Sequence, residues 1–323
     1  MELLPPSSGR QNSVPANQKD NLTACKLPVA NSKFRHVLFL FLFYLLSLVS
    51  LGQAASGLVL TNAQPSALID FSANTPSSAG TIPQTAFTAA GFSPDPSTSG
   101  RLNSNAWAFT GFSDGALAFG GTNTTGDYAR GSASAAVSGG GLYAYTGAPA
   151  SLSNPTLMIQ PIAADFTPGT ITLRIQNKGT TNITQLAVSY NLYVRNDGDW
   201  ANTFNFSYSA NNSTYTPVVS LNYSSPVAQD ASGWVLVGSS PSRTTLITGL
   251  NIAPNAEYYL RWSSDDVPGG SGVRDELGLD DITIAATYVT PSPGLSINNS
   301  SLSEGNSNTK NYSFTVSISS PAP

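Results

Sequence analysis

Apolar and polar residues alternate with a period of two along much of the chain after residue 57. In residues 186–194 every second side chain is apolar, at Leu186, Val188, Tyr190, Leu192 and Val194. Residues 171–175 and 204–208 repeat this pattern, and residues 258–263 and 279–288 are further strand-like runs. Because successive side chains of a strand point to opposite faces, the pattern predicts strands with one buried face.

Turn-forming residues separate these runs at short intervals. Residues 107–112 are followed by Ser113-Asp114-Gly115, and a glycine triplet at 139–141 precedes the run 142–145. No 11-residue stretch after residue 56 has apolar residues at helical spacing. Short strands with Gly, Asn and Ser turns predict an all-β fold, an antiparallel β-sandwich of the jelly-roll type over residues 56–290.

A short Pro- and Gly-containing segment, residues 291–294, reads as a linker. After it, Leu295–Ile297 and the alternating residues 312–318 predict two more strands within residues 295–323. About 30 residues with two strands are too few for an independent domain. Either this tail pairs with the sandwich, or it is the truncated start of a second, immunoglobulin-like β module.

The first 55 residues have the layout of a leader with a secretory signal peptide. Lys33 and Arg35 precede an apolar segment, about 37–51, and small residues follow at Gly52, Ala54 and Ala55. The apolar run is shorter than the roughly 20 residues of a spanning helix, although a retained signal anchor is the alternative. We therefore expect a secreted or cell-surface protein without a membrane span after cleavage.

Loss of this leader changes the chemistry that the chain can support. Cys25 and His36, the single cysteine and histidine, both lie within it, so the mature chain has no residues for disulfides, His/Cys zinc sites or His-dependent triads. No Gly-x-Ser-x-Gly motif is present, and we expect no enzymatic activity. Five of 14 basic and two of 18 acidic residues lie in the leader, which leaves a net charge of −7. That charge disfavours nucleic acid as a partner.

Six acidic residues are concentrated between residues 261 and 284. They are Asp265, Asp266, Asp275, Glu276, Asp280 and Asp281. Calcium takes six to eight oxygen ligands from flexible loops, so Asp265, Asp266, Asp280 and Asp281 are candidate calcium ligands. The alternatives are a solvated loop without an ion, or pairing of the aspartates with Arg261 or Arg274. Since neighbouring side chains of a strand face opposite ways, we expect Asp280 and Asp281 to point in different directions.

Two stretches resemble known families. The tail resembles the opening of a Calx-beta repeat in Leu295-Ser296-Ile297, Ser303-Glu304-Gly305 and residues 312–319. That resemblance implies an immunoglobulin-like module in which Glu304 is a calcium ligand. Arg261-Trp262, the acidic loop after it and residues 277–282 resemble a class of secreted bacterial β-sandwich domains, and Gly-Leu-Asp-Asp-Ile at 278–282 is also similar to the last strand of MAM and lectin-like jelly rolls. It implies that Asp280 and Asp281 help to hold a structural calcium.

Two functions remain open from the sequence. The first is a secreted, non-enzymatic, adhesion-type surface protein with calcium-associated modules, the N-terminal part of a larger multidomain protein. The alternative is a carbohydrate-binding accessory module of a secreted hydrolase, with Tyr143, Tyr145, Trp200 and Tyr215 as candidate sugar-stacking residues or as core. The expected partners are an extracellular glycan or a cell-surface protein, and the sequence predicts no oligomeric state.

Overall fold

The computed structural model describes residues 57–72, 85–94, 98–151, 153–290, 293–303, 305–307, 309, 311 and 313–319. The predicted leader with its signal peptide (residues 1–55), the first two residues of the predicted linker and Glu304 lie outside the described residues. The described part is built from strands, with two short 3₁₀ turns, η1 (Gly126–Tyr128) and η2 (Val219–Leu221). The prediction of an all-β fold is confirmed.

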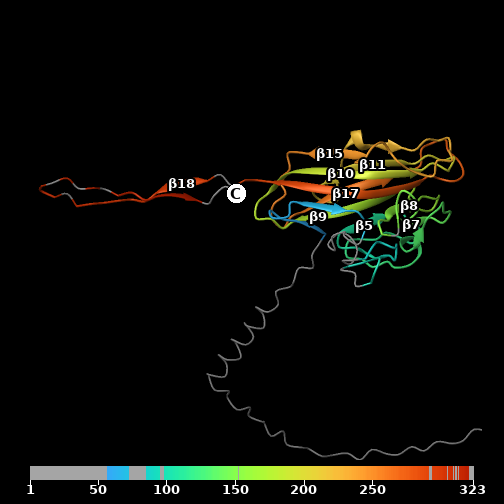
Figure 1. The fold of residues 1–323 in the computed structure, drawn as a ribbon, viewed down its shortest axis with the longest axis horizontal. Coiled ribbons are helices and arrows are strands. Elements are labelled where there is room, and N and C mark those ends of the chain that lie inside the picture. Colours follow the sequence, from blue (N-terminus) through green and yellow to red (C-terminus); the bar gives the residue numbers. More distant parts are fainter. Residues whose placement is uncertain are drawn as a thin grey trace, which may run out of the picture. The chain divides into compact units, whose positions relative to one another are not determined.

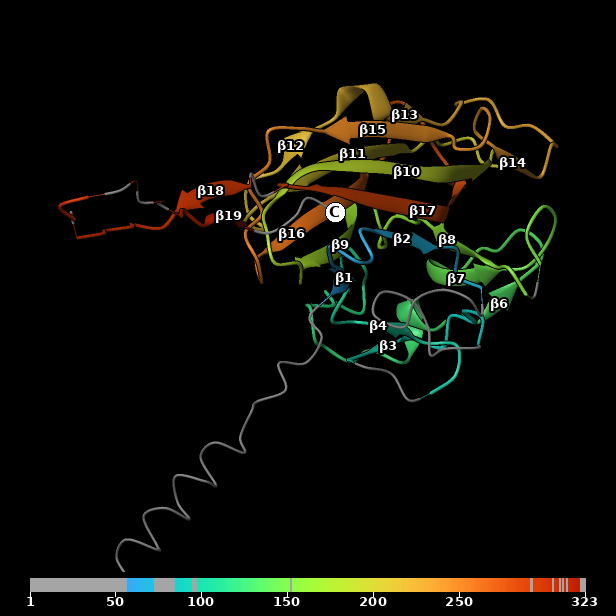
Figure 2. The ribbon, with the colours of Figure 1, turned by 60° about the vertical axis from the view of Figure 1, so that its left-hand side comes forward.

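Two sheets form the sandwich (Figures 1 and 2). The first, sheet A, contains β1 (Leu58–Leu60), β9 (Gly169–Asn177), β16 (Glu257–Ser264), β11 (Thr203–Ser209) and β12 (Thr216–Pro217) in that order, with β5 (Trp107–Thr110) paired to β9 and β13 (Tyr223–Ser224) to β11. Most pairs are antiparallel, as expected, but β1 pairs with β9 in parallel.

The second sheet, sheet B, has the order β14 (Trp234–Leu236), β10 (Ile183–Arg195), β17 (Glu276–Tyr288), β8 (Thr156–Gln160), β7 (Gly141–Tyr145) and β6 (Ser132–Ala133). β15 (Arg243–Ile247) pairs with β10, and β2 (Ser66–Ile69) pairs with β17. A small separate pair joins β3 (Phe92–Ser93) to β4 (Leu102–Asn103).

The core lies between the two sheets and follows the alternation of the strands. Along β16, Tyr258, Leu260 and Trp262 are buried, whereas the residues between them are half-buried. Trp262 meets Tyr190 of β10 edge-on across the core, with ring centres 5.6 Å apart. Each strand of sheet A therefore presents every second side chain on the outer face of the sandwich, where Tyr259 and Arg261 lie.

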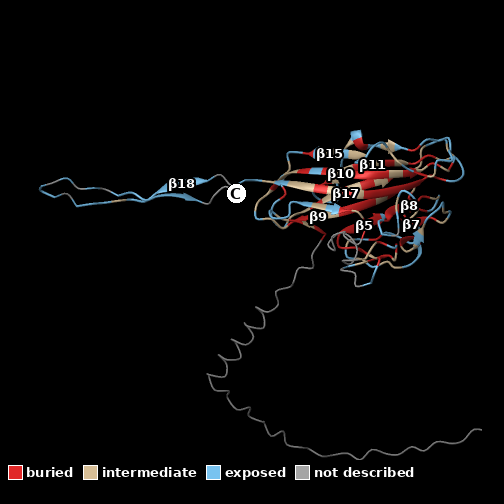
Figure 3. Cartoon of the chain, viewed as in Figure 1, coloured by how far each residue is buried: buried red, intermediate tan, exposed pale blue. Residues whose placement is uncertain are grey.

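The tail forms a hairpin of β18 (Gly294–Ile297) and β19 (Val316–Ser319), with Leu295 opposite Ile318. Within the described residues neither strand pairs with a strand of the sandwich. All eight residues are exposed (Figure 3). The second strand begins at Val316, four residues later than the pattern from 312 predicts. Assignment of the hairpin to an immunoglobulin-like module stays a prediction.

Candidate functional site

The outer face of sheet A bears a small pocket of about 250 Å³. Trp107 and Phe109 of β5 are buried in the core, so Ala108 and Thr110 face outward beside β9. The pocket is lined by Ala108, Phe109, Thr110, Ala116, Leu117, Ala118, Phe119, Thr170, Thr172, Asn212 and Arg261. Its volume lies just below the roughly 300–1,000 Å³ typical of pockets for drug-sized ligands. It suits one ring-sized group with a few polar contacts.

Arg261 forms one wall of the pocket. In the register of the sheet it lies opposite Thr172 of β9, and its Nε donates a hydrogen bond to Thr172 Oγ1 at 3.1 Å. Its Nη2 donates to Asn212 Oδ1 at 3.4 Å. The guanidinium carbon lies 3.6 Å from the centre of the Tyr215 ring, whose hydroxyl also donates to Asn212 Oδ1. Burial lowers the pKa of Arg261. Burial also raises the pKa of Tyr215, and the positive charge of Arg261 only partly offsets that rise.

A second arginine is stacked on an aromatic ring of this face. The guanidinium carbon of Arg174 lies 4.6 Å from the centre of the Phe119 ring, and Phe119 in turn lies 5.8 Å from the ring of Tyr259. Arg174 Nη1 is 3.2 Å from a carboxylate oxygen of Glu257, which accepts a hydrogen bond from the Tyr259 hydroxyl. The face thus offers flat, half-buried rings beside hydroxyl, amide and guanidinium groups.

The outer face of sheet B also carries aromatic residues, but they are covered. Tyr143, Tyr145 and Trp234 are only 8%, 4% and 7% exposed, and they form a second apolar cluster with Met158. Tyr145 and Trp234 have ring centres 4.7 Å apart. Side chains of 133, 137, 150 and 193 pack against this cluster. These rings are therefore closed to a ligand.

A β-bulge in β17 changes the expected direction of the paired aspartates. The register with β10 shifts at this point, and Asp281 has a φ of 49°. Leu277 and Leu279 before the pair and Ile282 and Ile284 after it all belong to the core. The alternation is thus reset across the bulge. The expectation that Asp280 and Asp281 point in different directions is wrong, because both leave the core on the same outer face.

Both aspartates at the bulge have hydrogen-bond partners. Asp280 accepts from Thr156 Oγ1 at 3.0 Å and from the Asp281 backbone N–H at 2.8 Å. Asp281 accepts from Asn191 Nδ2 at 2.7 Å. Burial, together with the nearby Asp281 charge, raises the pKa of Asp280 to about 8. Burial also raises the pKa of Asp281.

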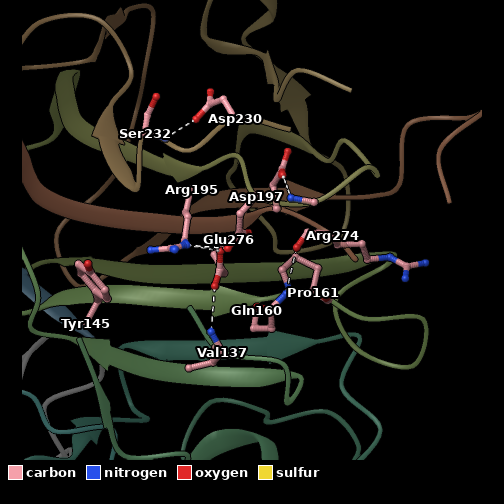
Figure 4. Close-up of polar contacts among 12 residues, drawn as sticks. Val137, Tyr145, Gln160, Pro161, Arg195, Asp197, Asp230, Ser232, Arg274 and Glu276 are labelled. Carbon is pink, nitrogen blue, oxygen red and sulfur yellow. Dashed lines mark hydrogen bonds and ion pairs between the residues drawn. The ribbon is translucent and has the colours of Figure 1, made fainter. Parts of the chain in front are cut away.

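Glu276 is the first residue of β17 (Figure 4), and Asp275 comes directly before it; both side chains are buried. Glu276, 1% exposed, accepts from the Val137 backbone N–H at 3.1 Å. Arg195 Nε lies 2.6 Å from Asp197 and 3.7 Å from Glu276. Burial, together with the neighbouring Asp197, raises the pKa of Glu276 to about 8, and burial raises that of Asp275 to about 6. Such closed carboxyls are out of reach of a substrate.

Of the predicted metal ligands, Asp280 and Asp281 share one outer face at the bulge, but Asp265 and Asp266 do not form one site with them. Asp265 is exposed after β16, whereas Asp266 makes two hydrogen bonds with Arg274, at 2.7 and 2.6 Å. The arginine-paired alternative is therefore seen at Asp266. Among the described residues no group of three or more Asp, Glu, His or Cys could hold a metal ion. Calcium binding stays a prediction, with Glu304 outside the described residues.

One of the four candidate sugar-stacking residues lies beside the pocket. Tyr215 is stacked on Arg261, which lines the pocket. Tyr143 and Tyr145 are covered, and the centre of the Trp200 ring lies 4.0 Å from the Arg274 guanidinium carbon, away from the pocket lining. Sequence reasoning missed Phe119 and Tyr259. The alternation of β16 carried a signal for Tyr259, since it separates the buried Tyr258 and Leu260.

No family model and no curated protein matches the sequence. Solved structures similar to this chain include TmCBM61 in complex with β-1,4-galactotriose, at 9% identity and a TM-score of 0.24, covering 42% of this chain and 72% of that one. A non-crystalline cellulose specific carbohydrate-binding module, CBM28, has 10% identity, a TM-score of 0.26 and coverages of 44% and 78%. The K3 cleaved adhesin domain of Lys-gingipain from Porphyromonas gingivalis has 9% identity and a TM-score of 0.24, and the match covers 43% of this chain and 78% of that one. At these scores, the likeness indicates neither a shared site nor a shared ligand.

In the part of the chain that the structure describes, no helix is both long and apolar enough to cross a membrane.

Proposed function

We propose that this protein binds carbohydrate in the pocket on the outer face of sheet A. The observation that carries the proposal is the pair of arginine–aromatic stacks, Arg261 on Tyr215 and Arg174 on Phe119, beside outward threonines. A sugar ring has an apolar face of C–H groups and a rim of hydroxyls. It therefore matches a site with flat rings for contact and a few fixed polar groups for orientation.

The polar groups of the pocket are suited to hydroxyl recognition. Thr110 and Thr170 share a hydrogen bond of 2.7 Å and stay at the surface, so each oxygen keeps further bonding capacity. The Asn212 side chain offers an amide N–H₂ group in addition to the oxygen used by Arg261 and Tyr215. These groups can exchange their hydrogen bonds with water for bonds with sugar hydroxyls.

We further propose a binding role without catalysis, in a secreted protein. The leader pattern supports secretion. Glu276 and Asp280 of β17, whose pKa values are raised to about 8, are buried, which speaks against general acid catalysis by these two groups. A carbohydrate-binding accessory module of a secreted hydrolase is the form of this function that the pocket favours.

The adhesion-type function is a second candidate, and the hairpin supports it. Leu295 and Ile318 are paired across β18 and β19 yet 74% and 69% exposed. Contiguous exposed apolar side chains mark surfaces that another protein element covers. A Calx-beta-like module beginning here would make the protein multimodular. Loss of cell or matrix attachment on replacement of Leu295 and Ile318 by Thr, with glycan binding kept, would favour this candidate.

The test of carbohydrate binding is a titration of the purified protein against a panel of neutral and acidic polysaccharides. We expect Tyr215→Ala and Phe119→Ala each to weaken binding about tenfold, which corresponds to about 1.4 kcal/mol. Phe314→Ala is the matched control, because Phe314 is an exposed ring (57%) in the tail. Binding that is unchanged in both pocket variants would place the site elsewhere, and no binding to any polysaccharide would reject the proposal.

A further inference from the structure

We infer that the pocket is built for an acidic glycan, with the carboxylate of a uronic acid residue bound by Arg261. This inference rests on the proposed function and names its substrate class. It follows from a difference between two arginines on the same sheet face, from the charge of the pocket lining, and from the hydrogen-bonding state of one guanidinium.

Arg174 and Arg261 have similar aromatic partners but different charge partners. Arg174 forms an ion pair with Glu257 at 3.2 Å. Within the described residues, Arg261 forms no ion pair, and its polar partners, Thr172 Oγ1, Asn212 Oδ1 and the Tyr215 hydroxyl, are all neutral. A half-buried guanidinium is stable without a carboxylate, but it lacks the partner that most favours its charge.

The pocket is a local positive site on an acidic protein. The chain has 18 acidic and 14 basic residues, yet Arg261 alone carries a charge among the described residues that line the pocket. A single uncompensated charge between low-dielectric walls concentrates its field at the opening. Such an arrangement favours an anionic group on the ligand. No Asp or Glu is among the described residues that line the pocket, so no acidic side chain of the lining competes with the ligand for Arg261.

The free edge of Arg261 fits a carboxylate. Nε donates to Thr172, Nη2 makes one long hydrogen bond of 3.4 Å to Asn212, and the remaining interaction is with the neutral Tyr215 stacked on the guanidinium face. The two Nη atoms can therefore donate parallel hydrogen bonds to the two oxygens of one carboxylate. A uronate residue supplies this group on a sugar ring that can also lie against the half-buried rings of the face.

The decisive experiment compares polygalacturonate with the same polymer after reduction of its carboxyl groups to neutral galactose residues. We expect the purified protein to bind the acidic polymer at least about tenfold more tightly. Arg261→Gln is expected to remove this preference while leaving weak binding to the neutral polymer. Arg243→Gln is the matched control, because Arg243 also lies over a tyrosine, Tyr223 at 5.5 Å, but on β15 outside the pocket.

The outcomes separate the inference from the proposed function. Equal binding of the acidic and the reduced polymer by the wild-type protein would overturn the inference and keep carbohydrate binding. Absence of binding to both polymers and to the whole panel would overturn both. Poly-glutamate binding as tightly as polygalacturonate would also overturn the inference, because a carboxylate without a sugar would then suffice. The wild-type comparison stands even where Arg261→Gln impairs folding.

Discussion

The two outer faces of the sandwich use aromatic residues in different ways. On sheet A, Phe119, Tyr215 and Tyr259 are half-buried and are stacked with or beside arginines at an open pocket. On sheet B, Tyr143, Tyr145 and Trp234 are packed beneath chain segments and contact one another. The number of aromatic residues on a face therefore does not locate a binding site. What lies above the rings decides whether they bind a ligand or stabilise the fold.

The covered face of sheet B acts as a second, smaller core. The Val137 backbone donates to Glu276 and anchors one covering segment, while the Trp234 ring lies directly on Gly278 of β17. Changes on this face should alter the free energy of unfolding and leave ligand binding by the folded molecules unchanged. Changes on the face of sheet A should do the reverse. The following predictions test this division.

Trp234→Ala should have the largest effect. Removal of a buried tryptophan side chain costs about 3–5 kcal/mol, and the ring is 7% exposed against Tyr145. Urea unfolding should show a midpoint shifted accordingly, while the folded fraction keeps its affinity for glycan. Tyr215→Ala, by contrast, should lower the free energy of unfolding by less than about 1 kcal/mol. A loss of glycan affinity in folded Trp234→Ala would contradict the division of the faces.

Gly278→Ala should cost about 1–3 kcal/mol through overpacking. A methyl group at this position would lie 2.6 Å from Trp234 Cζ3 and 2.9 Å from Thr156 Cγ2. The shortest of these contacts is with the Trp234 ring, so the same substitution should cost less free energy of unfolding in a Trp234→Ala background. A double-mutant cycle of unfolding free energies measures this coupling. Additive effects would show that Trp234 does not rest on Gly278.

The acids of β17 should make the protein less stable as the pH rises. Burial raises the pKa of Asp280 to about 8, far above its value of about 3.9 in an unfolded chain. Between these values the native state binds more protons than the unfolded state, so the free energy of unfolding falls with increasing pH and levels off above about 8. Asp280→Asn should flatten this slope by an amount on the order of 1 kcal/mol between pH 6 and 8.

The control for this pH effect is Asp265→Asn, because Asp265 is exposed in the loop after β16. Chemical unfolding at several pH values should give the same slope for this variant as for the wild type. A slope that is equally steep in Asp280→Asn would show that Asp280 is ionised in the native protein at neutral pH.

Much of the sandwich could be predicted from alternation alone. The run 186–194 lies within β10, and residues 258–263 lie within β16, because one face of each strand is apolar along its whole length. Parallel pairing of β1 with β9 has no local signal, since the partners are more than 100 residues apart. The bulge at Asp281 is likewise a property of the register with β10, and two consecutive aspartates do not reveal it.

The pocket was less accessible to sequence reasoning than the strands. Tyr215 stacks on Arg261 from a loop that is distant in sequence, and Phe119 reaches Arg174 in the same manner. Low exposure of Tyr143 and Tyr145 depends on segments that fold over sheet B. Contacts of this kind are set by tertiary structure. Residue type could therefore nominate the aromatic residues but could not separate open rings from covered ones.

Calcium should have the smallest effect, and it should act on the face of sheet B. The bulge brings Asp280 and Asp281 to one side, and Asp70 is close enough to raise the pKa of both. Because protonation of Asp280 competes with a cation, stabilisation by calcium should grow between pH 6 and 9. At a calcium concentration equal to Kd the gain is about 0.4 kcal/mol. We expect a slightly higher Tm in millimolar Ca²⁺ than in EDTA at pH 9, and no difference in the Asp280→Asn/Asp281→Asn double variant. A rise in Tm with Ca²⁺ that is equal at pH 6 and pH 9, or that persists in the double variant, would place any calcium away from this bulge.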